Sequence, residues 1–192
     1  MTVSNSIADL LAELVSGPFA LQQIYAAVPA EIRGRKPGPG KWSVNEIVLH
    51  VADTEIVYSD RVRRALSTER AEVAAFDQDV WASSMAYSAL DAELAMDAFA
   101  ALRRYNYALL KRQPAAAFGR TLIHSENGEM TLRKVVESMA RHPKAHVAQI
   151  ERTLQALRSQ RPTRASERWS RDGNLAYSAR DLPAEREPNP KW

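Results

Sequence analysis

The chain has 192 residues, with 26 Lys and Arg against 23 Asp and Glu, and no cysteine. Both signs of charge are interspersed and acidic residues interrupt the apolar runs, so we expect neither a nucleic-acid partner nor a membrane partner. Without cysteine the chain has no disulfide framework and no thiolate of its own. The first residues lack a basic segment followed by a long apolar core, so we expect an untargeted, cytoplasmic protein.

The first predicted helix carries apolar residues at helical spacing from Ile7 to Val28. Pro18 lies inside this pattern and is expected to kink or restart the helix. A loop rich in glycine and proline follows at 34–40, after which Ser43 and Glu46 have the spacing of a capping box. The second helix is therefore predicted to begin after Ser43.

Two more helices are predicted in the second half of the chain. The third spans Leu90 to Arg112, with an inward side made of Leu90, Leu94, Phe99, Leu102, Tyr105 and Leu109. A short hairpin or tight loop is expected at 121–130, because Asn127-Gly128 is a turn signal. Thr131 should cap the fourth helix, whose predicted inward face is Leu132, Val135, Met139, His142, His146, Ile150 and Leu157.

The composition changes near residue 159, where Arg, Ser, Pro and acidic residues replace the apolar pattern. Such a segment cannot form a core of its own. We therefore predict one helical domain at 1–158 and an irregular or partly disordered extension at 159–192, which Trp169, Tyr177 and Trp192 could anchor against the domain.

Three histidines fall on the predicted inward faces of two helices. His50 lies between Ile47 and Val51, whereas His142 and His146 are four residues apart, so they share one helix face with Cβ atoms about 6 Å apart. Three imidazoles from two helices could bind a divalent metal ion and leave coordination positions open for water or substrate. Zn, Ni or Fe would suit such ligands, and the pattern does not rank them.

Neighbouring polar side chains could orient these imidazoles. Asp53 and Glu55 follow His50 by about one turn, and Gln149 follows His146 by three residues, so all three are candidate hydrogen-bond partners of the ligands. A carboxylate at either position could instead serve as a general base.

The same spacing also fits core histidines that are hydrogen-bonded and bind no metal. Pro143 bears on both interpretations, because a proline inside a helix removes a backbone hydrogen bond and could displace His142, mark a kink or begin a new helix.

His124 lies in the turn-rich segment and is predicted to be exposed, so it is left out of the ligand set. Trp42 is predicted to pack on the helix it precedes, Trp81 could form a pocket wall, and a solvated helix face is predicted for Arg61, Arg63 and Arg64.

The chain resembles the DinB/YfiT family of four-helix-bundle metalloenzymes, particularly its YfiT-like branch, over roughly residues 5–158. The resemblance rests on KWSVNEIVLHVADTE, AFDQDVWA and GEMTLRKVVESMARHPKAHVAQI, which occur in the order and at the separations typical of that branch. It implies an all-α, up-down-down-up four-helix bundle, often a homodimer, with a divalent metal held by His50, His142 and His146. This chain departs from many members in having Ala145 before His146, where they have adjacent histidines, and in having Pro143.

Members of this family are implicated as thiol S-transferases that use low-molecular-weight thiols, and others are named metal-dependent hydrolases. The resemblance therefore implies a small-molecule thiol that is activated at the three-histidine metal site and attacks an electrophilic substrate. The absence of cysteine is compatible with a thiol that comes from outside the chain. The alternatives are a hydrolase, in which the ion activates water, and a metal-binding or structural bundle without turnover.

Overall fold

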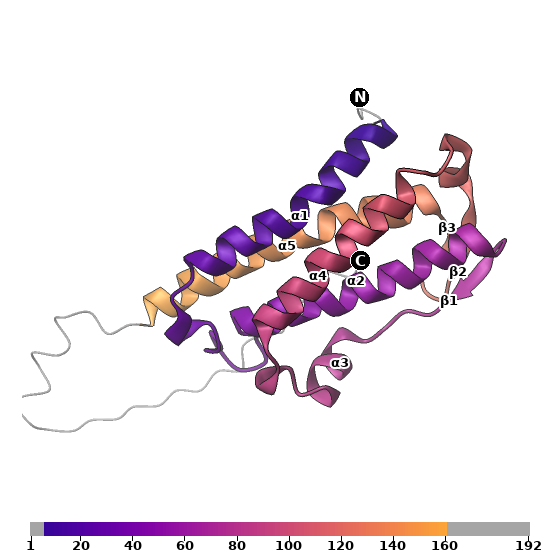
Figure 1. The fold of residues 1–192 in the computed structure, drawn as a ribbon. Coiled ribbons are helices and arrows are strands. Elements are labelled where there is room, and N and C mark those ends of the chain that lie inside the picture. Colours follow the sequence, from indigo (N-terminus) through magenta and orange to yellow (C-terminus); the bar gives the residue numbers. More distant parts are fainter. Residues whose placement is uncertain (1–5, 161–192) are drawn as a thin grey trace, which may run out of the picture.

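The computed structural model describes residues 6–160, in which four long helices form a bundle (Figure 1). These helices are α1 (Ile7–Ala27), α2 (Val44–Ser67), α4 (Ala92–Leu110) and α5 (Leu132–Ser159). Helix α1 packs against α4 and α5, and α2 packs against the same two helices. Because α1 and α5 run in one direction while α2 and α4 run in the other, the up-down-down-up topology implied by the resemblance is confirmed.

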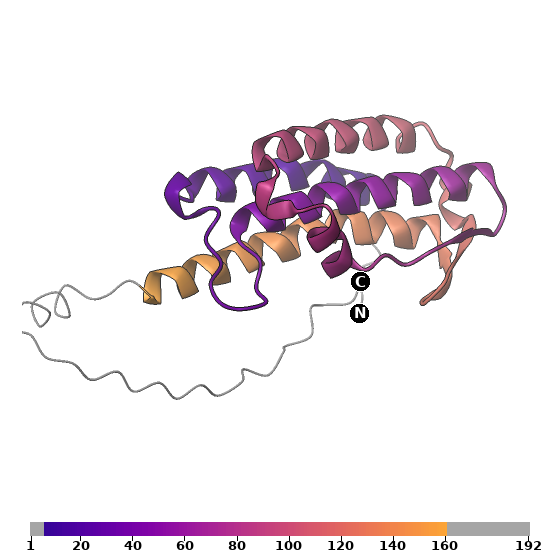
Figure 2. The same cartoon turned by 90° about the horizontal axis from the view of Figure 1, so that it is seen from below.

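A long crossover connects the parallel helices α2 and α4 and returns along the length of the bundle (Figure 2). It contains β1 (Ala71–Val73), α3 (Gln78–Ser84) and the 3-10 turn η2 (Tyr87–Ala89). Two other 3-10 turns, η1 (Ala30–Ile32) and η3 (Ala115–Gly119), follow α1 and α4. The crossover therefore lies against the bundle and supplies residues close to α2.

A three-stranded sheet closes one end of the bundle. The predicted hairpin is confirmed as β2 (Thr121–His124) and β3 (Gly128–Thr131), which pair antiparallel with Leu122 opposite Met130. Gly128 has a φ of +68°, a backbone conformation that glycine adopts without steric cost. Strand β1, which was not predicted from the sequence, pairs parallel with β2.

Side-chain caps define the starts of the two helices that carry the three histidines. At α2 the Ser43 hydroxyl accepts a hydrogen bond from the Glu46 N–H at 3.3 Å, and the Glu46 carboxylate accepts one from the Ser43 N–H at 2.8 Å. At α5 the Thr131 hydroxyl accepts from the Lys134 N–H at 3.2 Å. Both predicted caps are confirmed, so local sequence defines where each helix begins.

The apolar core is divided into two clusters along the bundle. The cluster nearer the sheet includes Leu14, Val62 and Met139, and the other includes Leu21, Phe99 and Ile150. Polar side chains occupy the level between them, although each is at most 5% exposed: His50, Glu55, Arg103, Asn106, His142 and His146. The middle of the bundle is therefore a buried polar layer.

The predicted inward face of the third helix is right for Phe99 and wrong for three of its other residues. Leu90, Leu94 and Tyr105 are 47%, 68% and 63% exposed, and the inward face of α4 is instead Ala92, Met96, Phe99, Arg103, Asn106 and Leu110. The error arises because Arg103 and Asn106 were taken for outward residues. Glu55, 48 residues from Arg103 and 51 from Asn106, makes their burial favourable by hydrogen bonding to both.

Neither proline divides its helix. Pro18 lies inside α1 and Pro143 inside α5, and both helices are continuous through the proline, so the restart considered at each position is wrong. Helix α5 continues to Ser159, the first residue of the extension predicted at 159–192. The rest of that extension from residue 161, with its three anchoring aromatic residues, lies outside the described part of the chain. Within residues 6–160, every helix is too short or too polar to cross a membrane.

Candidate metal centre

The structure brings the three histidines together in the buried polar layer. Helix α2 supplies His50, and α5 supplies His142 and His146 from one face. The Nε2 atom of His142 lies 3.2 Å from that of His50 and 3.1 Å from that of His146. The ligand atoms of all three residues lie within 4.8 Å of one another.

The two short distances, from His142 to His50 and from His142 to His146, fit coordination of a single ion. Zn–N bonds of about 2.0–2.1 Å at tetrahedral angles place two ligand nitrogens roughly 3.3 Å apart. The observed contacts of 3.1 and 3.2 Å are close to this value. Three nitrogens that bind one ion would leave further coordination positions for water or substrate.

The electrostatic environment keeps the three imidazoles uncharged at neutral pH. Burial, with the His146 ring as a second cause, lowers the pKa of His50 to about 2. Burial also lowers the pKa of His146 to about 4, against the effect of Gln149, and holds the pKa of His142 well below its ordinary value. Metal ions bind the neutral form of imidazole, so the donor set fits a divalent cation without a change in protonation.

A hydrogen bond determines which nitrogen of His146 faces the centre. Its Nδ1 lies 2.6 Å from Oε1 of Gln149, which places the ring proton on Nδ1 and directs the Nε2 lone pair toward the other histidines. The Thr54 hydroxyl lies 3.4 Å from Nε2 of His50. Thr54 was not selected from the sequence, although its position four residues after His50 on the same helix face was a usable signal.

Comparison with known proteins identifies the family. A model of the DinB superfamily matches residues 13–150, most of the chain. The chain belongs to the DinB superfamily. The family resemblance based on the sequence motifs is therefore confirmed, and the matched residues include parts of all four bundle helices.

Several relatives of this DinB chain carry the name "Putative metal-dependent hydrolase". Two come from Oceanobacillus iheyensis: one is 28% identical over 115 residues, which cover 60% of this chain and 66% of the relative, and the other is 28% identical over 111 residues, covering 58% and 64%. A third, from Bacillus licheniformis, is 26% identical over 142 residues, covering 73% and 81%. The chain thus spans just under two thirds of the length of the first two relatives.

A solved structure has the same fold. YfiT from Bacillus subtilis, described as "a probable metal-dependent hydrolase with an unusual four-helix bundle topology", superimposes with a TM-score of 0.73. The match covers 82% of this chain and 92% of YfiT at 20% sequence identity. At that identity the likeness establishes the DinB bundle fold.

The two carboxylates proposed as partners of the histidines have other partners in this DinB bundle. Glu55 accepts hydrogen bonds from the guanidinium of Arg103 and from the Asn106 amide. Asp53 accepts a hydrogen bond from the hydroxyl of Tyr87, which attaches η2 of the crossover to α2. Gln149, the third predicted partner, lies within hydrogen-bond distance of the His146 ring.

Aromatic rings flank His50 on the side of the crossover. The Trp42 ring centroid lies 4.8 Å from that of His50, and Phe76 stacks on the same ring at 6.3 Å. Trp81 contacts Phe76, with their centroids 4.9 Å apart. Trp42 also packs against the apolar cluster that contains Phe99 and residues of α2, as predicted, so it contacts both the apolar core and the His50 ring. Phe76 was missed, since only the crossover brings it to α2.

A surface hollow adjoins these rings between α2 and the crossover. Its lining includes Val57, Arg61, Ala75, Phe76, Val80 and Trp81, so the prediction of Trp81 as a pocket wall is confirmed. Phe76 belongs both to this hollow and to the surroundings of His50. The lining also includes the charged residues Asp60, Arg64, Glu72 and Asp77, and Phe76 is what connects the hollow to His50.

The basic residues of α2 differ from the predicted solvated face. Arg61 donates to the carbonyl of Ala74 at 2.9 Å, and Arg63 donates to the amide oxygen of Asn106 at 2.9 Å. Only Arg64 of the three is exposed, in an ion pair with Asp60. The prediction fails for Arg61 and Arg63 because the crossover and α4 pack beside them.

His124 is not an exposed loop residue. It ends β2, is 5% exposed, and accepts a hydrogen bond at Nδ1 from the Glu126 N–H at 3.2 Å. Its Nε2 lies 3.0 Å from Nη2 of Arg61. Strand pairing and Arg61 bury it at the sheet, and it is not one of the three clustered histidines.

Proposed function

We propose that this chain is a divalent-metal-dependent enzyme whose ion is held by His50, His142 and His146. The observation that carries the proposal is the convergence of three uncharged Nε2 atoms, 3.1 and 3.2 Å apart, in a buried layer. A divalent ion held there lowers the pKa of a water or thiol bound to it and so supplies a nucleophile at neutral pH.

The chain's own residues contribute binding and orientation. Gln149 holds the His146 ring with its Nε2 lone pair facing the other two histidines. Trp42 and Phe76 cover His50 and limit the access of bulk water on that side. The hollow lined by Phe76 and Trp81, together with charged residues such as Arg61 and Glu72, offers a partly apolar surface for the substrate.

For the nucleophile we propose an external low-molecular-weight thiol that attacks an electrophilic substrate. This choice is supported by the hydrogen bonds that the two carboxylates close to His50 in sequence make with other residues. Glu55 accepts hydrogen bonds from Arg103, and Asp53 accepts one from Tyr87. Neither is therefore placed to donate a proton to a leaving group. Conjugation of a thiolate with an electrophile needs less proton transfer than hydrolysis does.

Hydrolysis is the second candidate, and the names of the relatives support it. The same centre would then activate water in place of a thiol. The two reactions differ in one requirement, because only S-transfer depends on added thiol.

Metal content is the first test of this proposal. Elemental analysis of protein purified without an affinity tag should give close to one ion per chain, and a variant carrying His50→Ala and His146→Ala should lose it. Little metal in both proteins, even after reconstitution, would leave three core histidines in a structural bundle.

The second test separates the nucleophiles. The metal-loaded protein is assayed with 1-chloro-2,4-dinitrobenzene plus free cysteine, and in parallel with p-nitrophenyl acetate without thiol. Thiol-dependent conjugation that the double histidine variant lacks supports S-transfer. Ester cleavage alone, lost in the same variant, assigns the chain to the hydrolases.

A further inference from the structure

Two buried carbonyl groups in this bundle lack their ordinary helical donors. Proline has no N–H, so Pro18 cannot donate to the carbonyl of Leu14, four residues earlier in α1. Pro143 likewise cannot donate to the carbonyl of Met139 in α5. Leu14 and Met139 are both 0% exposed, and a buried carbonyl without a donor is costly.

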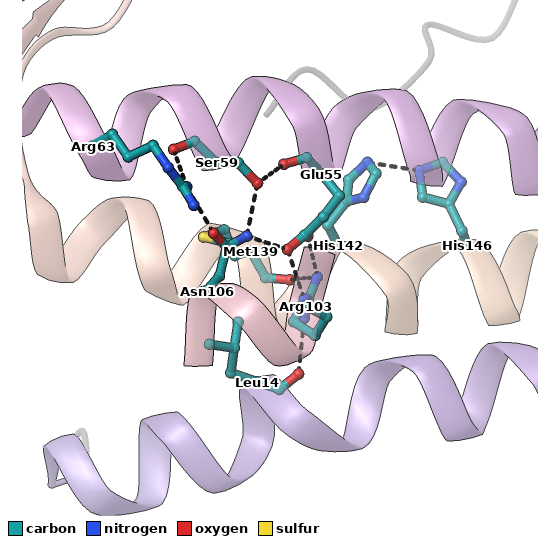
Figure 3. A network of polar contacts seen from close by, with 9 residues as sticks. All are labelled: Leu14, Glu55, Ser59, Arg63, Arg103, Asn106, Met139, His142 and His146. Atoms are coloured by element: carbon teal, nitrogen blue, oxygen red, sulfur yellow. Dashed lines mark hydrogen bonds and ion pairs between the residues drawn. The ribbon is translucent and has the colours of Figure 1, made fainter. Parts of the chain in front are cut away.

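One side chain supplies both missing donors. Arg103 of α4 donates from Nη1 to the Leu14 carbonyl at 2.9 Å and from Nη2 to the Met139 carbonyl at 3.0 Å (Figure 3). Arg103 is itself 1% exposed. Its guanidinium therefore completes α1 and α5 at the points where the two prolines interrupt the backbone hydrogen bonding.

The same guanidinium is attached to α2. Arg103 donates from Nε to Oε1 of Glu55 at 3.0 Å and from Nη2 to Oε2 at 2.6 Å, and Asn106 donates to Oε1 at 2.9 Å. Burial raises the pKa of the Glu55 carboxyl, and the charge and hydrogen bonds of Arg103 oppose this effect. All four bundle helices thus meet at one planar, five-donor group, whose fork geometry a lysine cannot reproduce.

These attachments lie close in sequence to the histidines. Met139 precedes His142 by three residues in α5, and Glu55 follows His50 by five residues in α2. Figure 3 shows Arg103 between Leu14 on one side and the helices of Glu55 and His142 on the other. Arg103 therefore links the two helices from which the three imidazoles converge.

We propose that Arg103 is a positioning residue, which replaces the amide donors missing at Pro18 and Pro143 and thereby fixes the register of α5 against α2 at the histidine centre. The proposal rests on the proposed function only where it concerns metal binding. The hydrogen bonds from Arg103 to the carbonyls of Leu14 and Met139, which lack proline donors, do not depend on the proposed function.

The metal arm compares Co²⁺ affinity and the visible spectrum of bound Co²⁺ among four proteins: the parent chain, Arg103→Met, Arg103→Lys and Val62→Ala. Val62 is fully buried in the core cluster nearer the sheet, about three turns after His50 on α2, so its variant controls for general loss of stability. Both Arg103 variants should bind Co²⁺ about tenfold to a hundredfold more weakly, with an altered spectrum, as for the loss of other groups that orient ligands. Parent-like affinity and spectrum in both would overturn the proposal.

The stability arm is a double-mutant cycle between Arg103→Met and the pair Pro18→Ala, Pro143→Ala. The alanines restore amide donors to Leu14 and Met139, so the drop in melting temperature caused by Arg103→Met should be clearly smaller in the alanine background. Additive shifts would overturn the proposal. If Arg103→Met does not fold, Arg103→Lys takes its place in the cycle.

The two experiments distinguish failure of the proposed function from failure of the positioning role of Arg103. A parent protein that binds no Co²⁺ contradicts the proposed function, and the cycle still decides whether Arg103 substitutes for the proline amides. A parent that binds Co²⁺ while the Arg103 variants match it contradicts the positioning role alone.

Discussion

Gly17 of α1 lies so close to Pro143 of α5 that a Cβ atom on Gly17 would come within 2.9 Å of Pro143 Cγ. The same Cβ would lie 3.3 Å from Nη1 of Arg103. The close approach of the two helices therefore depends on the absence of a side chain at position 17. It also lets a guanidinium from α4 reach the carbonyl of Leu14.

We expect Gly17→Ala to lower the free energy of unfolding by about 1–3 kcal/mol, because Cγ of Pro143 is part of a ring closed onto the backbone and has little room to move. Gly119→Ala is the matched control, since a Cβ there meets nothing within 4 Å. Urea denaturation of both variants measures the difference. An equal effect of the two substitutions would show that the contact is not tight in solution.

The metal-free protein should lose stability as the pH falls below neutrality. The pKa of His50 is about 2 and that of His146 about 4 in the folded state, each lowered mainly by burial from an ordinary value of 6.5. Below about pH 6.5 the unfolded chain therefore takes up protons that the folded chain does not, so the free energy of unfolding decreases, by up to about 1.4 kcal/mol per pH unit for each histidine. This loss ends once the pH reaches the folded-state pKa.

Urea denaturation in the presence of a chelator, at about pH 7.5, 6.5 and 5.5, measures this dependence. His146→Gln removes one of the groups, so its stability should depend less steeply on pH than that of the parent. Equal slopes for parent and variant would mean that His146 is protonated or solvated in the folded protein.

Gln149 and Asp53 should differ in their effect on metal binding. Gln149→Ala removes the hydrogen bond to Nδ1 of His146 and should weaken Co²⁺ binding about tenfold to a hundredfold. Asp53→Asn should leave the affinity unchanged, because Asp53 bonds to Tyr87. Isothermal titration of both variants tests the contrast, and the reverse order would assign Asp53 to the centre.

Trp42 should report on occupancy of the centre by fluorescence. Its ring lies 4.8 Å from that of His50, so a paramagnetic ion such as Cu²⁺ bound to His50 should quench its emission. We expect saturable quenching at one equivalent of ion, and we expect Trp42→Phe to remove most of it. Quenching that persists in Trp42→Phe would place the ion elsewhere.

Local chemistry accounts for what the sequence predicted correctly. Ser43 and Thr131 cap helices through groups three residues away, and Asn127-Gly128 forms a turn whose geometry only a few residues favour. The i, i+4 spacing of His142 and His146 likewise places both on one face of any helix. Such features need no knowledge of the rest of the chain.

Which residues of α4 face the core could be known only from the tertiary structure. Arg103 and Asn106 are polar, so a sequence pattern places them in water, and only Glu55 from another helix makes their burial favourable. His124 was predicted wrongly for the same reason, since its burial depends on Arg61, 63 residues away.

The sequence by itself determined the helices, the hairpin and the histidines that face inward, because these follow from hydrogen bonds and periodicities within a few residues. Only the tertiary structure decided that two helices tolerate internal prolines and that three imidazoles converge at 3.1 and 3.2 Å. Both outcomes depend on groups from different helices meeting in a buried layer. There an arginine far away in sequence donates to the carbonyls that the prolines leave without an amide partner.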